Sequence, residues 1–505
     1  MSSKRLIINM VSNIVSFIVS MGISFFLTPY IINTVGKEAY GFVGLANNFV
    51  SYAGLITLAL NSLAKRFITI KIHQNDFEGA NKYFTSVTIA NIITSVLMMI
   101  PAIIIVSNMN KIINVPFEIL NDVQILWALV FLNFLIGLIT STYNVITFAT
   151  NRLDLSAIRS IQSNILKVII LVALFSIFTP NVWYLGLAAL ICNLFIFRTN
   201  INYKRKLLPQ LSIKLIYFDA KVIQELLLSG IWSVITKLGQ ILSDGLDLLI
   251  TNIFINASAM GTLSVAKTLP SAISSLLVTT SGIFLPQLTI YYAKGEIDKL
   301  VEELKKSMKI SGLFTIIIMS AMVVLGYSFY SLWVPGQDII LIQTLSVITI
   351  LTVIVSGVVS TLFGVYTIVN KLKVNSYVIL FQGILNAAIV FLLLKTTNLG
   401  IIAVAGVSSI TATIRNLTFV PIYTSKCLGV SKKTFYPTII RYIISSIITI
   451  IGDFIISYNI DKSTWFGLIC SGIVCVVFAS ILNYFLFLNK KERKFIIKKL
   501  VTIIK

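Results

Sequence analysis

The sequence predicts an all-α protein that crosses a membrane about fourteen times, from composition and from the length of its apolar runs. Of its 505 residues, 57% are hydrophobic and only 11% are charged, and the mean hydropathy is +0.94. A water-soluble domain of this size needs more polar surface than that composition supplies. The apolar runs are continuous, whereas a membrane β-barrel shows alternating segments of about ten residues.

About fourteen apolar runs are long enough to cross the roughly 30 Å of hydrocarbon in a bilayer as helices. Lipid offers backbone N–H and C=O groups no hydrogen-bond partners, so each run is expected to satisfy these groups internally. The predicted spans are residues 6–32, 42–64, 83–107, 122–146, 156–178, 181–203, 226–255, 257–289, 307–333, 338–369, 373–395, 398–424, 438–460 and 464–489.

Lysine and arginine residues are concentrated in alternate loops between these spans. Loops of this kind stay on the cytoplasmic side, so the pattern predicts that both chain termini are cytoplasmic. The opposite loops contain only Lys37, Lys111, Lys395 and Lys462. The basic segments are Lys4 and Arg5, 65–82, 152–159, 204–221, 294–309, 371–373, 426–433 and the tail from Lys490.

The net charge of +22 follows from this asymmetry, and no nucleic-acid partner is expected. Basic residues on one membrane face are attracted to anionic headgroups, so the lipid bilayer is the partner that the charge predicts. The C-terminal segment 490–505 mixes basic with apolar residues. Two interpretations of this tail are open: an amphipathic helix on the inner leaflet, or a solvated anchor that fixes the topology.

The two halves of the chain are weakly similar at an offset of 220 residues. Residues 40–48 align with 260–268, and residues 75–80 align with 295–300. Six spans separate equivalent positions, so the repeats would share one orientation about an axis along the membrane normal. Chance similarity between apolar helices is the alternative. The predicted organisation is a six-helix N-lobe at 1–203, a cytoplasmic linker at 204–225, a six-helix C-lobe at 226–437, two extra helices at 438–489 and a basic tail at 490–505.

Charged and polar residues within the spans gather on the seventh, residues 226–255. Lys237, Gln240, Asp244 and Asp247 follow one another at intervals of three, four and three residues, which predicts a single helical face. A charged side chain costs about 2.5–3.5 kcal/mol at the centre of a membrane. Those that a sequence retains usually face a bundle interior or a watery cavity.

Other spans add polar residues that are expected to line the same cavity. The first span carries Asn13 and Ser20, the fifth carries Lys167, and the second repeat carries Lys267 and Arg415. Two interpretations are open for these charges. They contact an anionic group or a coupling cation, or the basic side chains merely neutralise Asp244 and Asp247 inside the bundle.

Two basic residues, Lys65 and Arg66, close the predicted second span at its cytoplasmic end. They could form a gate that guides an anionic headgroup inward. The other interpretation is that they anchor the helix to the inner leaflet.

The sequence lacks the motifs of ATP-driven pumps and of hydrolases. It contains no P-loop, no zinc-type spacing of His and Cys, and no nucleophile elbow. The protein is therefore expected not to be an enzyme, to have no catalytic residues and to need no metal and no cofactor. Transport would be secondary, with the coupling ion, Na⁺ or H⁺, left open. The longest outer loop, about 108–121, leaves no room for an external catalytic domain.

The layout of the whole chain resembles the Wzx-type oligosaccharide flippases of the multidrug/oligosaccharidyl-lipid/polysaccharide exporter (MOP) superfamily. Four loose motifs carry the resemblance: 9–24 at the start of the first span, the outer turn 35–42, Lys65-Arg66-Phe67, and the loop 76–83. These motifs are typical of the superfamily and say little about the substrate.

The resemblance implies a V-shaped bundle of two lobes that moves an undecaprenyl-diphosphate-linked oligosaccharide across the bacterial cytoplasmic membrane by alternating access, for surface polysaccharide biosynthesis. Lys237, Lys267 and Arg415 would contact the diphosphate or acidic sugars. Asp244 and Asp247 would balance charge or bind a coupling ion. The implied partners are the lipid-linked oligosaccharide, the bilayer and other membrane proteins of polysaccharide assembly.

Two alternatives to a flippase remain. A cation-coupled drug or metabolite antiporter of the same superfamily would be expected to bury carboxylates in both lobes. This chain places them chiefly on the seventh span, with Asp453 as an isolated exception. A membrane-embedded glycan polymerase is disfavoured by the short outer loops.

Overall fold

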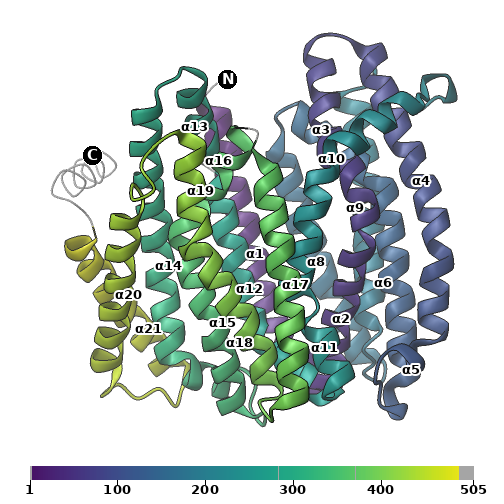
Figure 1. Ribbon diagram of the computed structural model, residues 1–505. Coiled ribbons are helices and arrows are strands. Elements are labelled where there is room, and N and C mark those ends of the chain that lie inside the picture. The colour runs from purple at the N-terminus through teal and green to yellow at the C-terminus, as the bar shows by residue number, and fades with distance from the viewer. Residues whose placement is uncertain (1–2, 283, 370, 488–505) are drawn as a thin grey trace. The chain divides into compact units, whose positions relative to one another are not determined.

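Every element in the described part of the chain is a helix, which confirms the all-α class (Figure 1). The computed structural model describes residues 3–282, 284–369 and 371–487. The predicted basic tail at 490–505 lies outside the described residues, and so does the side chain of Asn13.

The described helices follow one another with short connections, and their bounds are as follows. The α-helices are α1 (Ser3–Val35), α2 (Lys37–Ala53), α3 (Leu55–His73), α4 (Phe77–Ser107), α5 (Met109–Ile112), α6 (Leu120–Ser141), α7 (Val145–Ala149), α8 (Leu153–Ile177), α9 (Tyr184–Leu207), α10 (Ala220–Gln240), α11 (Asp247–Phe254), α12 (Ala257–Gly282), α13 (Leu285–Ala293), α14 (Ile297–Trp333), α15 (Ile339–Val359), α16 (Phe363–Ile368), α17 (Leu372–Thr396), α18 (Ile401–Leu417), α19 (Phe419–Leu428), α20 (Tyr436–Ser457) and α21 (Trp465–Leu486). Short 3₁₀ segments are η1 (Phe117–Ile119), η2 (Thr142–Asn144), η3 (Leu215–Tyr217) and η5 (Ser360–Leu362), and η4 (Ile241–Gly245) is a π-helix.

Packing divides the chain into two compact units, Met1–Ser264 and Val265–Lys505, and each is described by itself. The division lies within α12, whereas the sequence predicted a linker at 204–225. The difference arises because α10, the expected first helix of the C-lobe, packs against α3 and α4 of the first unit. The predicted lobe boundaries, which concern the sequence repeat, stay a prediction.

The membrane spans agree with those predicted. Twelve described helical segments are long and apolar enough to cross a membrane. The pair α2 and α3 passes the same test together but bends by 68° between its two helices. The remaining predicted span, 257–289, coincides in position with α12 and α13 but is not among the described segments that pass this test. Thirteen of the fourteen predicted spans thus have a described counterpart that is long and apolar enough to cross a membrane.

The order of elements repeats along the chain, as the 220-residue offset predicted. α4 begins at Phe77 and α14 at Ile297, and each follows a residue with positive φ, Asn75 (58°) or Gly295 (71°). Asn and Gly are the residue types that adopt this backbone most readily. Farther along, α6, η2, α7 and α8 are matched in order by α15, η5, α16 and α17, and α8 and α17 both contain 25 residues. The repeat is therefore structural.

The first unit is held together by an apolar core and by polar side chains that pair across helices. An apolar cluster that includes Ile68, Phe84 and Leu226 joins α3, α4 and α10. Farther along α4, the buried Asn91 donates a hydrogen bond from its Nδ2 to the Oδ1 of Asn61 on α3, at 3.0 Å. Such interhelical hydrogen bonds contribute about 0.6–2 kcal/mol in membranes.

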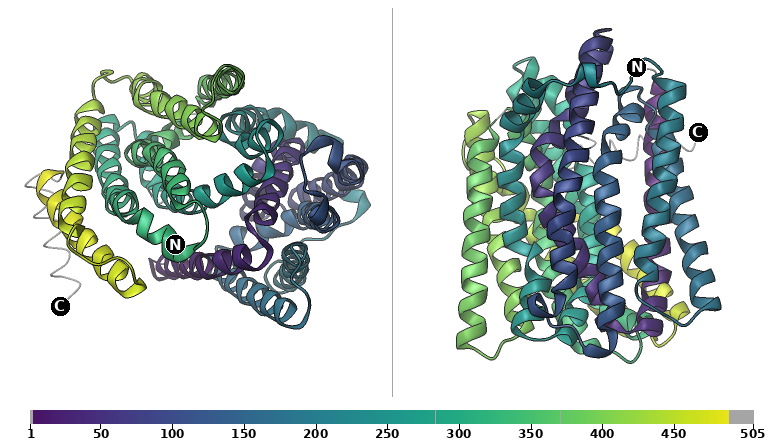
Figure 2. Two further views of the ribbon diagram at one scale, coloured as in Figure 1. Left: turned by 90° about the horizontal axis from the view of Figure 1, so that it is seen from below. Right: turned by 90° about the vertical axis from the view of Figure 1, so that its right-hand side faces the viewer.

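In the second unit, α14 packs against α15, α20 and α21. Figure 1 and the left view of Figure 2 show α20 and α21, in yellow, side by side. The buried Asn483 of α21 joins them: its Nδ2 donates to Thr449 Oγ1 at 2.8 Å, and its Oδ1 accepts from Ser445 Oγ at 2.6 Å. The two predicted extra helices are thus an integral part of this unit.

Candidate functional site

A π-helical turn, η4, separates α10 from α11 in the first unit. Its defining hydrogen bond runs from the Leu246 N–H to the Ile241 carbonyl, five residues earlier, at 3.0 Å. The adjacent Gly245 carbonyl accepts two hydrogen bonds from α2, from Asn48 Nδ2 at 3.0 Å and from Tyr52 Oη at 2.5 Å. Because π-turns within α-helices occur frequently at functional sites, this break is the candidate site of the first unit.

The corresponding stretch of the first repeat is a continuous helix. At the 220-residue offset, residues 241–245 align with 21–25, in the middle of α1. The break is therefore absent from α1 and present in the helix that carries the charges. Asp244 lies within the π-turn, and Asp247 is the first residue of α11.

The four polar residues predicted to share one helical face lie on both sides of this break. Lys237 is half-buried, and Gln240 and Asp244 are exposed. Asp247, in contrast, is only 1% exposed. The wider π-turn rotates the residues beyond it relative to a regular helix. The prediction of a common face stays a prediction, because Asp244 and Asp247 differ in burial but both lie close enough to the Tyr52 hydroxyl to interact with it electrostatically.

Lys237 forms no ion pair within the described part of the chain. A direct ion pair of Lys237 with Asp244 or Asp247 is thus absent from the described residues. Neutralisation of these carboxylates by Lys267 or Arg415 stays an open interpretation. Ionisable residues retained in spanning helices usually serve a ligand or a pathway, so the predicted contact of Lys237 with an anionic group stays a prediction.

The other predicted residues of the first unit have different surroundings. Ser20 on α1 accepts a hydrogen bond from Asn164 Nδ2 on α8 at 2.5 Å, so its hydroxyl joins two helices. Lys65 and Arg66 are exposed, and α3 continues about two turns beyond them to its end at His73. The helix thus continues beyond residue 64, where the second membrane span was predicted to end.

In the second unit, Lys267 is half-buried on α12 and Arg415 is half-buried on α18. The Arg415 Nη2 donates to Asn416 Oδ1 at 3.1 Å, and the guanidinium carbon lies 5.8 Å from the centre of the Phe363 ring. Asn416 Nδ2 donates in turn to Ser356 Oγ on α15 at 2.9 Å. These contacts fix the guanidinium among α15, α16 and α18. A cavity shared by Lys237, Lys267 and Arg415 stays a prediction.

The sequence reasoning missed two features of the first unit. Asn48 and Tyr52 hold the helix break, and their polar spacing of four residues inside a predicted span was the available signal. Arg159, taken as part of a basic loop, is buried in α8, where its guanidinium bonds Asn200 Oδ1 and Ser156 Oγ. The neighbouring Arg152 pairs with Asp154 instead. Nothing in the sequence indicated that the two arginines differ in this way.

Comparison with known proteins places this arrangement in a family. Residues 6–290 match the family described as polysaccharide biosynthesis protein. The uncharacterized membrane protein EpsK of Bacillus subtilis (strain 168) is 27% identical over 493 residues, which cover 97% of each chain.

Solved structures show the same fold at low sequence identity. The lipid II flippase MurJ, in an inward closed conformation, has a TM-score of 0.67 and 15% identity over 95% of this chain and 99% of its own. A multidrug resistance MATE family transporter of the MOP superfamily has a TM-score of 0.64 and 15% identity over 85% of this chain and 99% of its own. The chain therefore belongs to the polysaccharide biosynthesis protein family, as a multi-pass membrane protein with the fold of the MOP superfamily.

Proposed function

We propose that this protein is a flippase that moves undecaprenyl-diphosphate-linked oligosaccharide units across the bacterial cytoplasmic membrane by alternating access. Both termini would lie in the cytoplasm, and the product would serve surface polysaccharide biosynthesis. The family match supports the biosynthetic role, and the fold shared with a lipid II flippase supports translocation of a lipid-linked glycan.

The observation that carries the proposal is the half-buried Lys237, without an acidic partner in the described residues, beside a helix break in a membrane span. A diphosphate loses its hydration when it leaves water, and burial of an unpaired charge is costly. A lysine offsets that loss through charge-assisted hydrogen bonds. Lys267 and Arg415 supply the same chemistry from the second unit.

Coupling to Na⁺ or H⁺ would use the carboxylates at the break. Asp244 is exposed, so a cation can reach it, whereas Asp247 is buried beside the segment that Asn48 and Tyr52 hold. Binding of a cation or proton to either carboxylate would change the charge balance around Lys237 and thereby favour one state of the transporter.

The test is translocation of a lipid-linked oligosaccharide in proteoliposomes, scored by the access of an external sugar-modifying enzyme. Lys237→Ala, Lys267→Ala and Arg415→Ala should each lower the rate, by about tenfold for one lost charge-assisted contact. The matched control is Lys111→Ala, which removes one exposed lysine from α5 and should leave the rate unchanged. Native translocation that none of the three variants reduces would contradict the assigned site.

One observation favours a second candidate, a cation-coupled drug or metabolite antiporter. The chain shares its fold with a multidrug resistance transporter, and it retains two carboxylates at the helix break. Uptake of a cationic dye by the same proteoliposomes, without glycan translocation and with loss in Asp244→Asn, would establish the antiporter and refute the flippase.

A further inference from the structure

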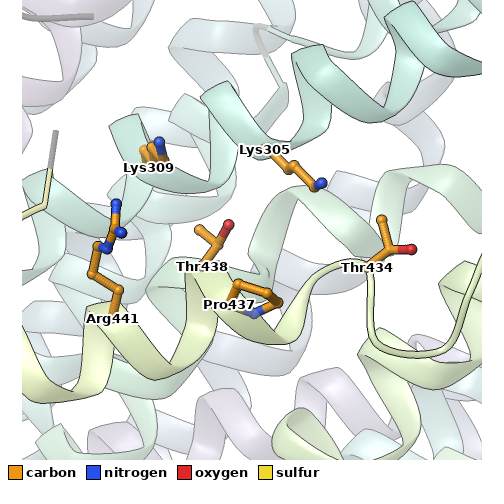
Figure 3. A pocket seen from close by; sticks show the side chains of 6 residues that line it. All are labelled: Lys305, Lys309, Thr434, Pro437, Thr438 and Arg441. Atoms are coloured by element: carbon orange, nitrogen blue, oxygen red, sulfur yellow. The ribbon is translucent and has the colours of Figure 1, made fainter. Parts of the chain in front are cut away.

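A basic cavity lies between α14 and α20 in the second unit, and no role assigned above uses it. Its volume is about 230 Å³. Figure 3 shows Lys305 and Lys309 on one helix, across from residues of the segment that begins the other. The lining residues are Lys305, Lys309, Thr434, Pro437, Thr438 and Arg441.

The lining combines three basic side chains with two hydroxyl groups and includes no carboxylate. Lys305 and Lys309 are four residues apart and so lie on the same side of α14. Glu302 and Glu303 both pair with Lys306, at 3.0 and 3.8 Å, and neither lines the cavity. The cavity therefore presents concentrated positive charge together with hydrogen-bond donors, which is the chemistry that recognises phosphate.

The cavity lies at the level where both helices become apolar. α14 contains 37 residues, about 55 Å, so it exceeds the roughly 30 Å of a hydrocarbon layer, and its charged residues are in its first third. On α20, only apolar residues, Ser, Thr and Gly follow Arg441 for more than two turns. Side chains at the ends of such spans lie among lipid headgroups.

An apolar stripe leads away from the cavity along α20. Ile444, Ile448, Ile451 and Ile455 follow Arg441 at intervals of three and four residues, so they share its helical face, and all four are exposed. A soluble phosphate would make no contact with such a stripe, whereas the acyl chains of a lipid would pack along it. The combination of basic cavity and apolar stripe thus favours a lipid.

We propose that this cavity binds the headgroup of an anionic membrane phospholipid that carries two phosphodiesters, of the cardiolipin type. The charge of three cationic groups matches that of two phosphates better than that of a single phosphate. Basic pockets between spanning helices are known to hold such headgroups. The cavity is smaller than the roughly 300–1,000 Å³ of pockets that enclose whole ligands, which suits a headgroup whose chains stay in the bilayer. The site is independent of what the protein transports.

The test is native mass spectrometry of the full-length protein in detergent, titrated with cardiolipin. Lys305→Gln and Arg441→Gln should each weaken binding by about tenfold, the effect of one lost charge-assisted contact. Lys306→Gln removes a charge from the same helix turn outside the cavity and should bind like the native chain. Lys305→Arg and Arg441→Lys keep the charge and should retain binding, which separates loss of the site from loss of folding.

Three results would overturn the proposal. Equal loss in Lys306→Gln would show general attraction to the basic surface. Displacement of cardiolipin by inorganic pyrophosphate at similar concentration would show a site for soluble phosphate. Tighter binding of undecaprenyl diphosphate than of cardiolipin, lost in Lys305→Gln, would assign the cavity to a lipid-linked substrate. Should the Gln variants fail to fold, equal affinity of the native chain for cardiolipin and for phosphatidylcholine would also refute the site.

Discussion

Gly230 determines how closely α10 can approach α3 in the first unit. A Cβ atom at this position would clash with the Ala59 carbonyl oxygen and would stand 2.6 Å from the Ala59 Cα and 2.7 Å from its carbonyl carbon. Ordinary contacts of a Cβ begin at 3.4 Å. All three atoms belong to the backbone, so no side-chain rotation relieves the clash, and Gly230→Ala must move one helix by about 1 Å.

Two terms set the size of the effect. Overpacking in a tightly packed interior costs about 1–3 kcal/mol, and the upper value applies here because a whole helix must move. Alanine in place of glycine within a helix returns about 0.5–1 kcal/mol through the smaller backbone entropy of the unfolded chain. We therefore expect Gly230→Ala to lower the free energy of unfolding by about 2 kcal/mol.

The assay is thermal unfolding in detergent, followed by the reaction of a thiol-specific dye with the buried Cys192 of the same unit. Gly230→Ala should unfold at a lower temperature than the native protein. Gly22→Ala on α1 is the matched control: nothing lies within 4 Å of its added Cβ, so it should unfold at the same or a higher temperature. Equal midpoints for the two variants would refute the close approach of α10 to α3.

Two further predictions concern single carboxylates. Asp453 on α20 is 0% exposed, and neither of its carboxylate oxygens has a hydrogen-bond partner among the described residues. Asp453→Asn keeps the shape and removes a charge that is costly to bury, so the thermal midpoint should stay or rise; a marked fall would show that the carboxylate is paired. Asp76 caps α4, and the hydrogen bonds from the Lys71 side chain and from the Gly79 N–H hold the pKa of its carboxyl below the ordinary value. A lowered pKa stabilises the fold above the ordinary pKa of about 4 and loses that contribution as pH falls through the lowered value. The protection factor of the Gly79 amide against hydrogen exchange, which corrects for the pH dependence of the intrinsic rate, should therefore fall on acidification below pH about 4, and Asp76→Asn should show no such fall in this range.

The parts of the fold that could be predicted from the sequence are those set by local pattern. Apolar runs long enough to span a bilayer gave the helices, and the 220-residue offset gave matched starts at Phe77 and Ile297. The second span was predicted to end at residue 64 because Lys65 and Arg66 were taken as its boundary, and the helix itself runs on past them. Hydropathy reports where lipid ends, whereas a helix continues as long as its backbone bonds do, here to His73.

The candidate site was predicted less well because its geometry depends on distant contacts. Lys237, Gln240, Asp244 and Asp247 could be found by spacing, but spacing assumes a regular helix. The π-turn among them is held by Asn48 and Tyr52, which are 197 and 193 residues away from Gly245 in the chain. The basic cavity was not predicted, for a related reason. Arg441 was assigned to a span and Lys305 to a loop, and only the packing of α20 on α14 brings them together.

The repeat gives the helix break its significance. The two copies differ at several places, for example at the continuous α9 against the separate α18 and α19, and the departure at η4 is the one that coincides with the charges on the seventh predicted span. α1 remains a regular helix, and its Ser20 accepts a hydrogen bond from Asn164 of α8. α10 instead ends at a π-turn, buries Asp247 and leaves Lys237 without an acidic partner in the described chain. A break that served packing alone would not need ionisable groups, whose retention in a membrane is costly. The asymmetry between α1 and α10 is therefore the reason to propose the break, rather than the polar face that the two helices share, as the site of the first unit.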